Sequence, residues 1–204
     1  MKKALYPLYL LIHPIDGYEE LKYKKRFSVS ISFVIILLFF FGEVFRFQYY
    51  GFGYNPNDPK DLNILFILAR TVLLFILWSL SNWLFCSLTE GKGFFREVWA
   101  ASAYALTPYV LITYAVTIVS NVVVLEEIAF INYLSFIGMF WSVVLMLVAM
   151  KTIHEYSLSK VIFTLILTLA GIAVVLFLIA LSLTVYQQVF DIFRTMVNEI
   201  LYRL

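Results

Sequence analysis

The sequence predicts an all-α integral membrane protein in which five transmembrane helices are flanked by an N-terminal and a C-terminal amphipathic interfacial helix. Of its 204 residues, 63% are hydrophobic and only 14% are charged, whereas about a quarter of the residues in a soluble domain are charged. The mean hydropathy is +0.91. Five apolar runs each have the length of about 20 residues that a helix needs to cross a bilayer.

Segments with turn or charge chemistry separate the five runs. The first loop, QYYGFGYNPNDPKD, combines glycine, proline and asparagine, which are typical of turns. Two glycines, an acidic pair and the polar stretch KTIHEYSLSK mark the later boundaries. We therefore divide the chain into a cytoplasmic interfacial segment, 1–26, a five-helix transmembrane domain, 27–185, and an amphipathic C-terminal helix, 186–204. The predicted spans are 27–47, 62–85, 98–124, 128–150 and 161–185.

The distribution of Lys and Arg predicts the orientation of these spans. Ten of the 15 fall in the segments on the N-terminal side of the membrane and four on the other side, with Arg70 inside a span. Because cytoplasmic loops carry the excess of Lys and Arg, we expect the N-terminus in the cytoplasm and the C-terminus outside. The net charge of +2 and the lack of a basic block outside the membrane flanks argue against nucleic-acid binding.

Both flanking segments have features of helices that lie on a membrane surface. In 186–204, apolar residues recur at helical spacing with charged residues opposite, which predicts an amphipathic helix on the outer surface. Segment 15–26 is a weaker case on the cytoplasmic side. Its basic cluster is expected to face anionic lipid headgroups, at about 1 kcal/mol per cation. The cluster consists of Lys22, Lys24, Lys25 and Arg26.

Arg70 lies about eight residues into the second span, where an unpaired cation costs from about 3 to more than 10 kcal/mol. Its depth from the outer face matches that of Glu43 near the end of the first span, so we predict that Glu43 and Arg70 form an intramembrane ion pair. Two roles stay open: the pair fixes the docking of two helices, or it belongs to a substrate or proton site.

Other polar residues in the spans are expected to hold helices together. Ser79 and Asn82 can form hydrogen bonds between helices. The two histidines, His13 and His154, lack a third ligand at suitable spacing, so no metal site is expected. No cofactor motif and no catalytic constellation is recognisable, and TEGKGFF lacks the spacing of a phosphate-binding loop.

The stretch from Gly91 to Pro108 is interpreted as a device for packing and bending helices. Gly91 and Gly93 would let the chain reverse direction in the cytoplasm. Pro108 would kink the third span, with neighbouring helices or a hydroxyl such as that of Thr107 bonding to the freed backbone. Small residues let a neighbouring helix approach closely in lipid. The packing residues are Ala100, Ala101 and Ala103.

The same stretch and the N-terminus carry a family resemblance. HPIDGYEELK before the first span, the glycine-bearing loop and the Tyr-x-x-x-Pro spacing of YALTP together resemble the Yip domain family, the Ypt/Rab-interacting type of membrane protein, in its bacterial branch. The resemblance extends over roughly residues 10–185. It implies a five-helix domain with a cytosolic N-terminus and carries no catalytic residues.

The resemblance also implies what kind of function to expect. Eukaryotic members bind prenylated small GTPases, but their long cytosolic N-terminal region has no counterpart before the first predicted span, so we do not expect that activity. Bacterial members commonly occur beside sugar-type ABC transporter components. We therefore expect a non-enzymatic accessory or scaffold protein of the bacterial plasma membrane, whose partners are the lipid bilayer and another membrane protein or a second copy.

The alternative is a small transporter or channel. In that interpretation, Arg70, Glu43 and Asn82 line a path around the kink at Pro108. The small number of ionisable residues in the spans, and the lack of paired broken helices in an internal repeat, make it the second choice.

Overall fold

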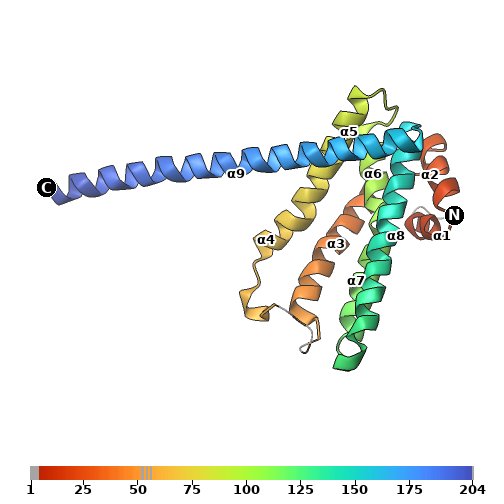
Figure 1. Cartoon of the computed structure of the whole chain (residues 1–204), viewed down its shortest axis with the longest axis horizontal. Helices are drawn as coiled ribbons and strands as arrows, with labels where there is room; N and C mark the ends of the chain where they lie inside the picture. Colours follow the sequence, from red (N-terminus) through yellow and green to blue (C-terminus); the bar gives the residue numbers. More distant parts are fainter. Residues whose placement is uncertain (1–4, 52, 54, 56, 204) are drawn as a thin grey trace.

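The computed structural model describes residues 5–51, 53, 55 and 57–203, and this part of the chain contains helices and no strands (Figure 1). The first four residues, with Lys2 and Lys3 of the charge count, lie outside the described residues, as does Leu204. Five helices are long and apolar enough to cross a membrane. The prediction of an all-α membrane protein with five such helices is confirmed. They cover Val29–Tyr49, Ile64–Leu88, Phe95–Val119, Ile128–His154 and Leu158–Glu199.

The first and fourth of these are single helices, whereas the second and third are interrupted. The first is α3, Val29–Tyr49, and the fourth is α8, Ile128–His154. The second begins as α4, passes through one π-helical turn, η3, and continues as α5. The third consists of α6 and α7. The bounds are Ile64–Leu68 for α4, Ala69–Leu73 for η3, Leu74–Leu88 for α5, Phe95–Ala105 for α6 and Thr107–Val119 for α7.

The interruption of the third helix lies at Leu106, two residues before Pro108. Proline has no N–H to donate and its ring crowds the preceding turn, so a break is expected there. The hydroxyl of Thr107 is buried and has no hydrogen-bond partner. Of the two predicted ways to bond to the freed backbone, a neighbouring helix or a hydroxyl such as that of Thr107, the second is therefore wrong for Thr107. Instead, Ser142 on α8 accepts a hydrogen bond from the backbone N–H of Tyr109, at 3.1 Å.

Two short helices fold over one end of the bundle, which we call the N-terminal end. They are α1, Tyr6–Ile12, and α2, Pro14–Tyr23, and each has a proline in its first turn. Segment 15–26 was expected to rest on the membrane surface. In the structure, its apolar side chains Tyr18 and Leu21 are fully buried because α2 packs against α6 and α8. The interfacial placement of α2 stays a prediction, with protein rather than lipid covering these side chains.

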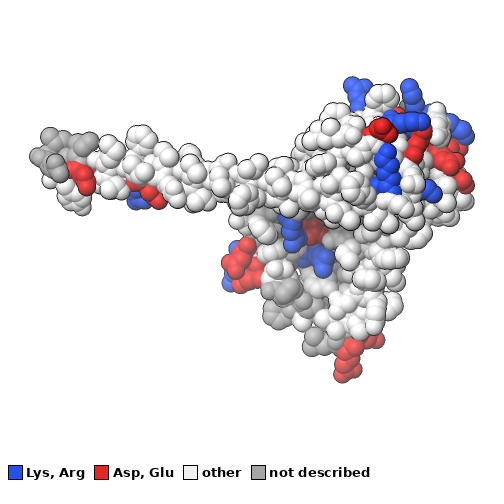
Figure 2. Space-filling view, turned by 45° about the horizontal axis from the view of Figure 1, so that its top comes forward, with Lys and Arg blue, Asp and Glu red and all other residues white. Residues whose placement is uncertain are grey.

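The buried core lies at this N-terminal end, around α6. From Ala100 to Ala105 every residue of α6 is buried, and the helix packs against α3, α5 and α8. Lipid tails are as apolar as the side chains, so close van der Waals packing of small residues holds such helices together. Lys, Arg, Asp and Glu also gather over this end of the molecule (Figure 2).

The fifth long helix, α9, runs without a break from Leu158 to Arg203. Its first part packs mainly on α5. The remainder leaves the bundle sideways, so that the C-terminus lies far from the other helices (Figure 1). The predicted boundary between a fifth span and a separate helix, 186–204, is not a break in the helix. Neither glycine nor proline occurs after Gly171, so nothing in the sequence stops the helix there.

Candidate functional site

Glu43 and Arg70, which the sequence analysis expected to pair, are in contact inside the bundle. Arg70 Nη2 donates a hydrogen bond to Glu43 Oε2 at 2.5 Å. The hydroxyl of Tyr109 on α7 donates to the other carboxylate oxygen, Oε1, at 2.7 Å. The side chain of Glu43 is 6% exposed and that of Arg70 is 53% exposed. The carboxylate is thus buried between two donors from different helices, and the guanidinium reaches an open space.

Arg70 lies in the π-helical turn η3, the one irregular turn within the second long helix. A π-helical turn adds a residue to the helix and changes which face the following side chains occupy, and such turns are frequent at functional sites. Thr71, the next residue, is buried and donates its hydroxyl to the carbonyl of Ile67 at 2.7 Å. No residue pattern in the sequence predicts this turn.

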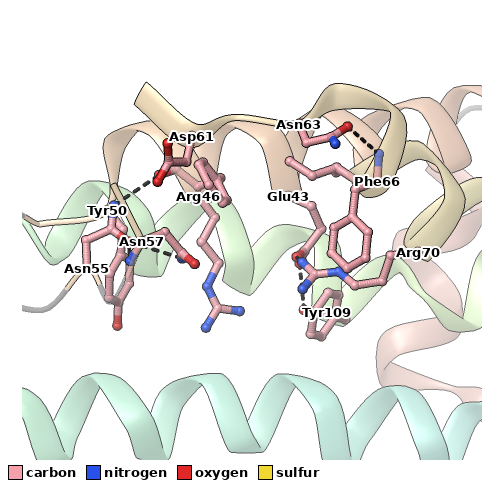
Figure 3. A pocket seen from close by; sticks show the side chains of 12 residues that line it. Glu43, Arg46, Tyr50, Asn55, Asn57, Asp61, Asn63, Phe66, Arg70 and Tyr109 are labelled. Carbon is pink, nitrogen blue, oxygen red and sulfur yellow. Dashed lines mark hydrogen bonds and ion pairs between the residues drawn. The ribbon is translucent and has the colours of Figure 1, made fainter. Parts of the chain in front are cut away.

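The ion pair borders a polar cavity of about 310 Å³ (Figure 3). The cavity lies where α3 ends and α4 begins, at the end of the bundle opposite to α1 and α2 (Figure 1). Residues from the last turns of α3, the loop after it, α4 and η3 line the cavity, and Tyr109 contributes from α7. Two arginines, two carboxylates and three asparagines take part. Arg46 and Tyr109 were not predicted from the sequence, although Tyr109 directly follows the proline of the kink. The polar lining comprises Glu43, Arg46, Asp61, Arg70, Tyr109 and the asparagines 55, 57 and 63.

Asn82 and Ser79 lie elsewhere, on α5, and do not line this cavity. Both are fully buried. Asn82 Nδ2 donates to Thr168 Oγ1 on α9 at 3.4 Å, whereas the hydroxyl of Ser79 has no hydrogen-bond partner. The structure therefore brings Glu43 and Arg70 together and places Asn82 in the contact between α5 and α9.

The helix-packing residues of α6 are all buried. Ala100, Ala101 and Ala103 have no exposed surface, and Pro108 in α7 is also buried. The carbonyl of Ala101 accepts a hydrogen bond from Tyr18 of α2 at 3.3 Å. This contact places the N-terminal helices directly on the small-residue face of α6.

Lys22 differs from the lipid-facing role expected for the basic cluster. Its ammonium group donates to the carbonyl oxygens of Ile153 at 2.8 Å and Lys92 at 3.1 Å, and it lies 3.5 Å from the carboxylate of Glu97. The side chain is only 10% exposed. The expectation that Lys22 faces lipid is therefore wrong, because all three ammonium donors point to groups of the protein.

The other three members of the basic cluster are exposed. Lys24 and Arg26 each form a 2.8 Å ion pair with Glu20. These hydrogen bonds, with that of Lys24 as the largest cause, hold the pKa of Glu20 below its ordinary value. Lys25 has a left-handed backbone, with φ of 49°. A role in lipid binding stays a prediction for Lys24, Lys25 and Arg26.

The loop between α5 and α6 is closed against the end of α8. Lys92 forms a 2.7 Å ion pair with Glu155, which lowers the pKa of Glu155 and raises that of Lys92. The left-handed residue in this loop is Glu90, with φ of 64°, and not a glycine. A Cβ on Gly91 would lie 2.7 Å from the carbonyl oxygen of Cys86. Gly91 is needed for a close approach rather than for the turn itself.

These features define a polytopic helical membrane protein. It has a polar cavity at one end, and at the other end α2, the loop before α6 and the end of α8 are joined by polar contacts. In the part of the chain that the structure describes, no group of three His, Cys, Asp or Glu side chains is arranged to hold a metal ion. Residues 8–181 match the Yip1 domain, and the chain belongs to this family of membrane proteins. No curated protein and no solved structure matches the chain.

Proposed function

We propose that the protein is a non-enzymatic accessory or scaffold protein that binds another membrane protein, or a second copy of itself, through helix contacts. The observation that carries this proposal is the second half of α9. From 176 to 199, every described side chain is exposed, and the majority are apolar. An apolar helical segment that makes no contact within its own chain is free to pack against a helix of another chain.

The first half of α9 anchors this element firmly. Thr168 accepts a hydrogen bond from Asn82, as described above. Gly171 lies so close to the ring of Phe85 on α5 that a Cβ at this position would collide with it. The start of α9 is thus fixed to the bundle, while its remainder projects from it (Figure 1). A partner bound to the projecting part would be held at a defined position relative to the bundle.

The alternative function, a small transporter, receives less support. It requires Asn82 to line one path with Glu43 and Arg70, but Asn82 is fully buried in the contact between α5 and α9. Flux of ions or small anions into liposomes that contain the purified protein, stopped by Arg70→Ala, would favour transport over the accessory role.

Crosslinking in the native membrane tests the accessory role. A photoreactive amino acid is placed at Leu178 of α9, which is 53% exposed, and, in a matched control, at Leu65 of α4, which is 76% exposed. We expect a protein adduct of defined mass from position 178 and lipid adducts alone from position 65. Mass spectrometry of the adduct then distinguishes a second copy from another membrane protein, such as a transporter component.

Two outcomes would contradict the proposal. Lipid adducts alone from both positions would show that α9 has no protein partner in the membrane. Protein adducts of equal yield from both positions would show collisions rather than a specific contact of α9.

A further inference from the structure

The polar cavity beside the Glu43–Arg70 pair contains more hydrogen-bond donors than the protein itself uses. We propose that this cavity binds a phosphate group, with Arg46 as the principal ligand and Arg70 as the second. This inference is independent of the accessory role proposed for α9, because the cavity is formed by α3, α4, η3, α7 and the loop after α3.

Arg46 is the cation that the protein leaves available. Among the described residues, no carboxylate lies within 4.0 Å of its guanidinium, which instead lies 5.6 Å from the ring centre of Tyr50. Figure 3 shows the side chain extending into the open space between Asn57 and the Glu43–Arg70 pair. A guanidinium presents five N–H groups in a planar fork, and this geometry matches two oxygens of a phosphate.

Arg70 retains donors even though it is paired. One nitrogen, Nη2, donates to Glu43, and both oxygens of Glu43 already accept a hydrogen bond, the second from Tyr109. The carboxylate is therefore occupied, whereas the half-exposed guanidinium has further N–H groups to offer. Asp61, the second carboxylate of the lining, is exposed at the edge of the cavity. In the described part of the chain, the positive charge in this cavity that is not paired with a carboxylate is that of Arg46.

The position of the cavity in the bundle agrees with binding of the phosphate of a lipid headgroup. Arg46 lies in the last turn of α3, where this span ends at Tyr49. The neighbouring helix α4 begins at Ile64, and its apolar side chains Leu65 and Phe66 are exposed toward the surroundings. A phospholipid can place its phosphate in the cavity and its acyl chains along α4. A soluble phosphate has the same chemistry, so the experiment must separate the two sources.

Isothermal titration of the full-length protein in a phosphate-free maltoside detergent tests the site. The probes are inorganic phosphate, short-chain phosphatidylglycerol, and the corresponding diacylglycerol, which lacks the phosphate. We expect saturable binding of a phosphate-bearing probe and none of the diacylglycerol. Arg46→Gln should weaken this binding about tenfold or more, because a charge-assisted pair of hydrogen bonds is lost. Arg194→Gln, at an exposed arginine of α9, should leave it unchanged.

The outcomes separate the two sources and decide on the proposal. Binding of both phosphate-bearing probes with similar affinity identifies a site for soluble phosphate, and binding of phosphatidylglycerol alone identifies a lipid headgroup site. If neither probe binds, or if Arg46→Gln binds as tightly as the unchanged protein, the proposal is wrong. Equal thermal unfolding midpoints of Arg46→Gln and the unchanged protein without probe verify that the variant is folded.

Discussion

Glu43 is the residue on which three helical segments converge. It projects from α3 and accepts hydrogen bonds from Arg70 in η3 and from Tyr109 in α7. Such an ion pair adds little stability compared with apolar residues of the same size, because the buried carboxylate of Glu43 loses its hydration. Removing one partner is a different change, since it leaves a buried carboxylate without its counter-charge. Substitution of Arg70 alone should therefore lower the free energy of unfolding more than substitution of Arg70 together with Glu43.

We predict that Arg70→Leu lowers the free energy of unfolding by about 2 kcal/mol, because Glu43 is left buried and unpaired. The double variant Glu43→Gln/Arg70→Leu should regain a large part of this loss, since it buries no charge. Chemical denaturation of the purified protein in detergent measures both values. Arg194→Leu, at an exposed site, serves as the control. A double variant less stable than Arg70→Leu would rule out this explanation.

At the residue scale, the depth of a side chain in the membrane is predictable from the sequence, but the side of the helix from which it projects is not. The pairing of Glu43 with Arg70 followed from their equal distance from the outer face. Tyr109 and Arg46 were missed because nothing in the sequence tells which side chains of α3 and α7 turn toward the same cavity. Lys22 was misassigned for a related reason: its carbonyl partners, at Lys92 and Ile153, come from distant segments.

At the element scale, α2 is held to the bundle by polar contacts of Lys22, Tyr18 and Tyr23 as well as by its apolar face. Lys22 connects α2 with the loop before α6 and with the end of α8. Glu97, the third partner, also accepts a hydrogen bond from the backbone N–H of Phe94 and so caps the start of α6. Loss of Lys22 would leave two carbonyl oxygens and a nearly buried carboxylate without this donor.

We predict that Lys22→Ala loosens α2, whereas Lys25→Ala does not, although the two lysines belong to the same basic cluster. Unsatisfied buried acceptors cost about 1 to 3 kcal/mol, and the exposed side chain of Lys25 leaves none behind. Hydrogen–deuterium exchange of segment 14–23, followed by mass spectrometry, compares the two variants. Equal exchange in Lys22→Ala and Lys25→Ala would mean that the contacts of Lys22 are not needed to hold α2.

The long elements were predictable because each of the five apolar runs is close to the length of a membrane span. Two features were not. The π-helical turn η3 depends on contacts of Arg70 and its neighbours rather than on a breaker residue in the sequence. The continuity of α9 past residue 185 was missed because composition changes there, although no residue stops the helix.

At the scale of the whole molecule, the two ends of the bundle differ in character. The N-terminal end is closed: α1 and α2 cover the core, and Lys22 and Lys92 hold the adjoining segments together. The opposite end is open at the polar cavity. From the N-terminal end, α9 leaves the bundle at a steep angle to the other long helices (Figure 1). The side of the membrane on which the C-terminal end of α9 lies therefore shows whether α9 crosses the bilayer.

We predict that α9 crosses the membrane, so that the N-terminus is cytoplasmic and the C-terminus outside. Apolar stretch 161–185 would extend about 37 Å as a helix, which exceeds the roughly 30 Å of bilayer hydrocarbon. The excess of Lys and Arg on the N-terminal side favours the same orientation. Single cysteines at Lys25, Glu126 and Thr195 in a Cys86→Ala background report the side of each segment through a membrane-impermeant maleimide applied to intact cells.

Glu126→Cys and Thr195→Cys should react in intact cells, and Lys25→Cys only after the membrane is permeabilised. Cys86 itself is fully buried, so the protein without an added cysteine gives the background. If Glu126→Cys reacts from outside but Thr195→Cys only after permeabilisation, α9 lies along the cytoplasmic surface and four helices span the bilayer. The 25 residues of 161–185, which are rich in Leu, Ile and Val, would then lie among headgroups rather than in hydrocarbon. A protein partner would have to cover them. The topology of α9 and its proposed contact with a partner are thus linked. If α9 does not cross the bilayer, its apolar side chains are not covered by hydrocarbon and must be covered by the partner.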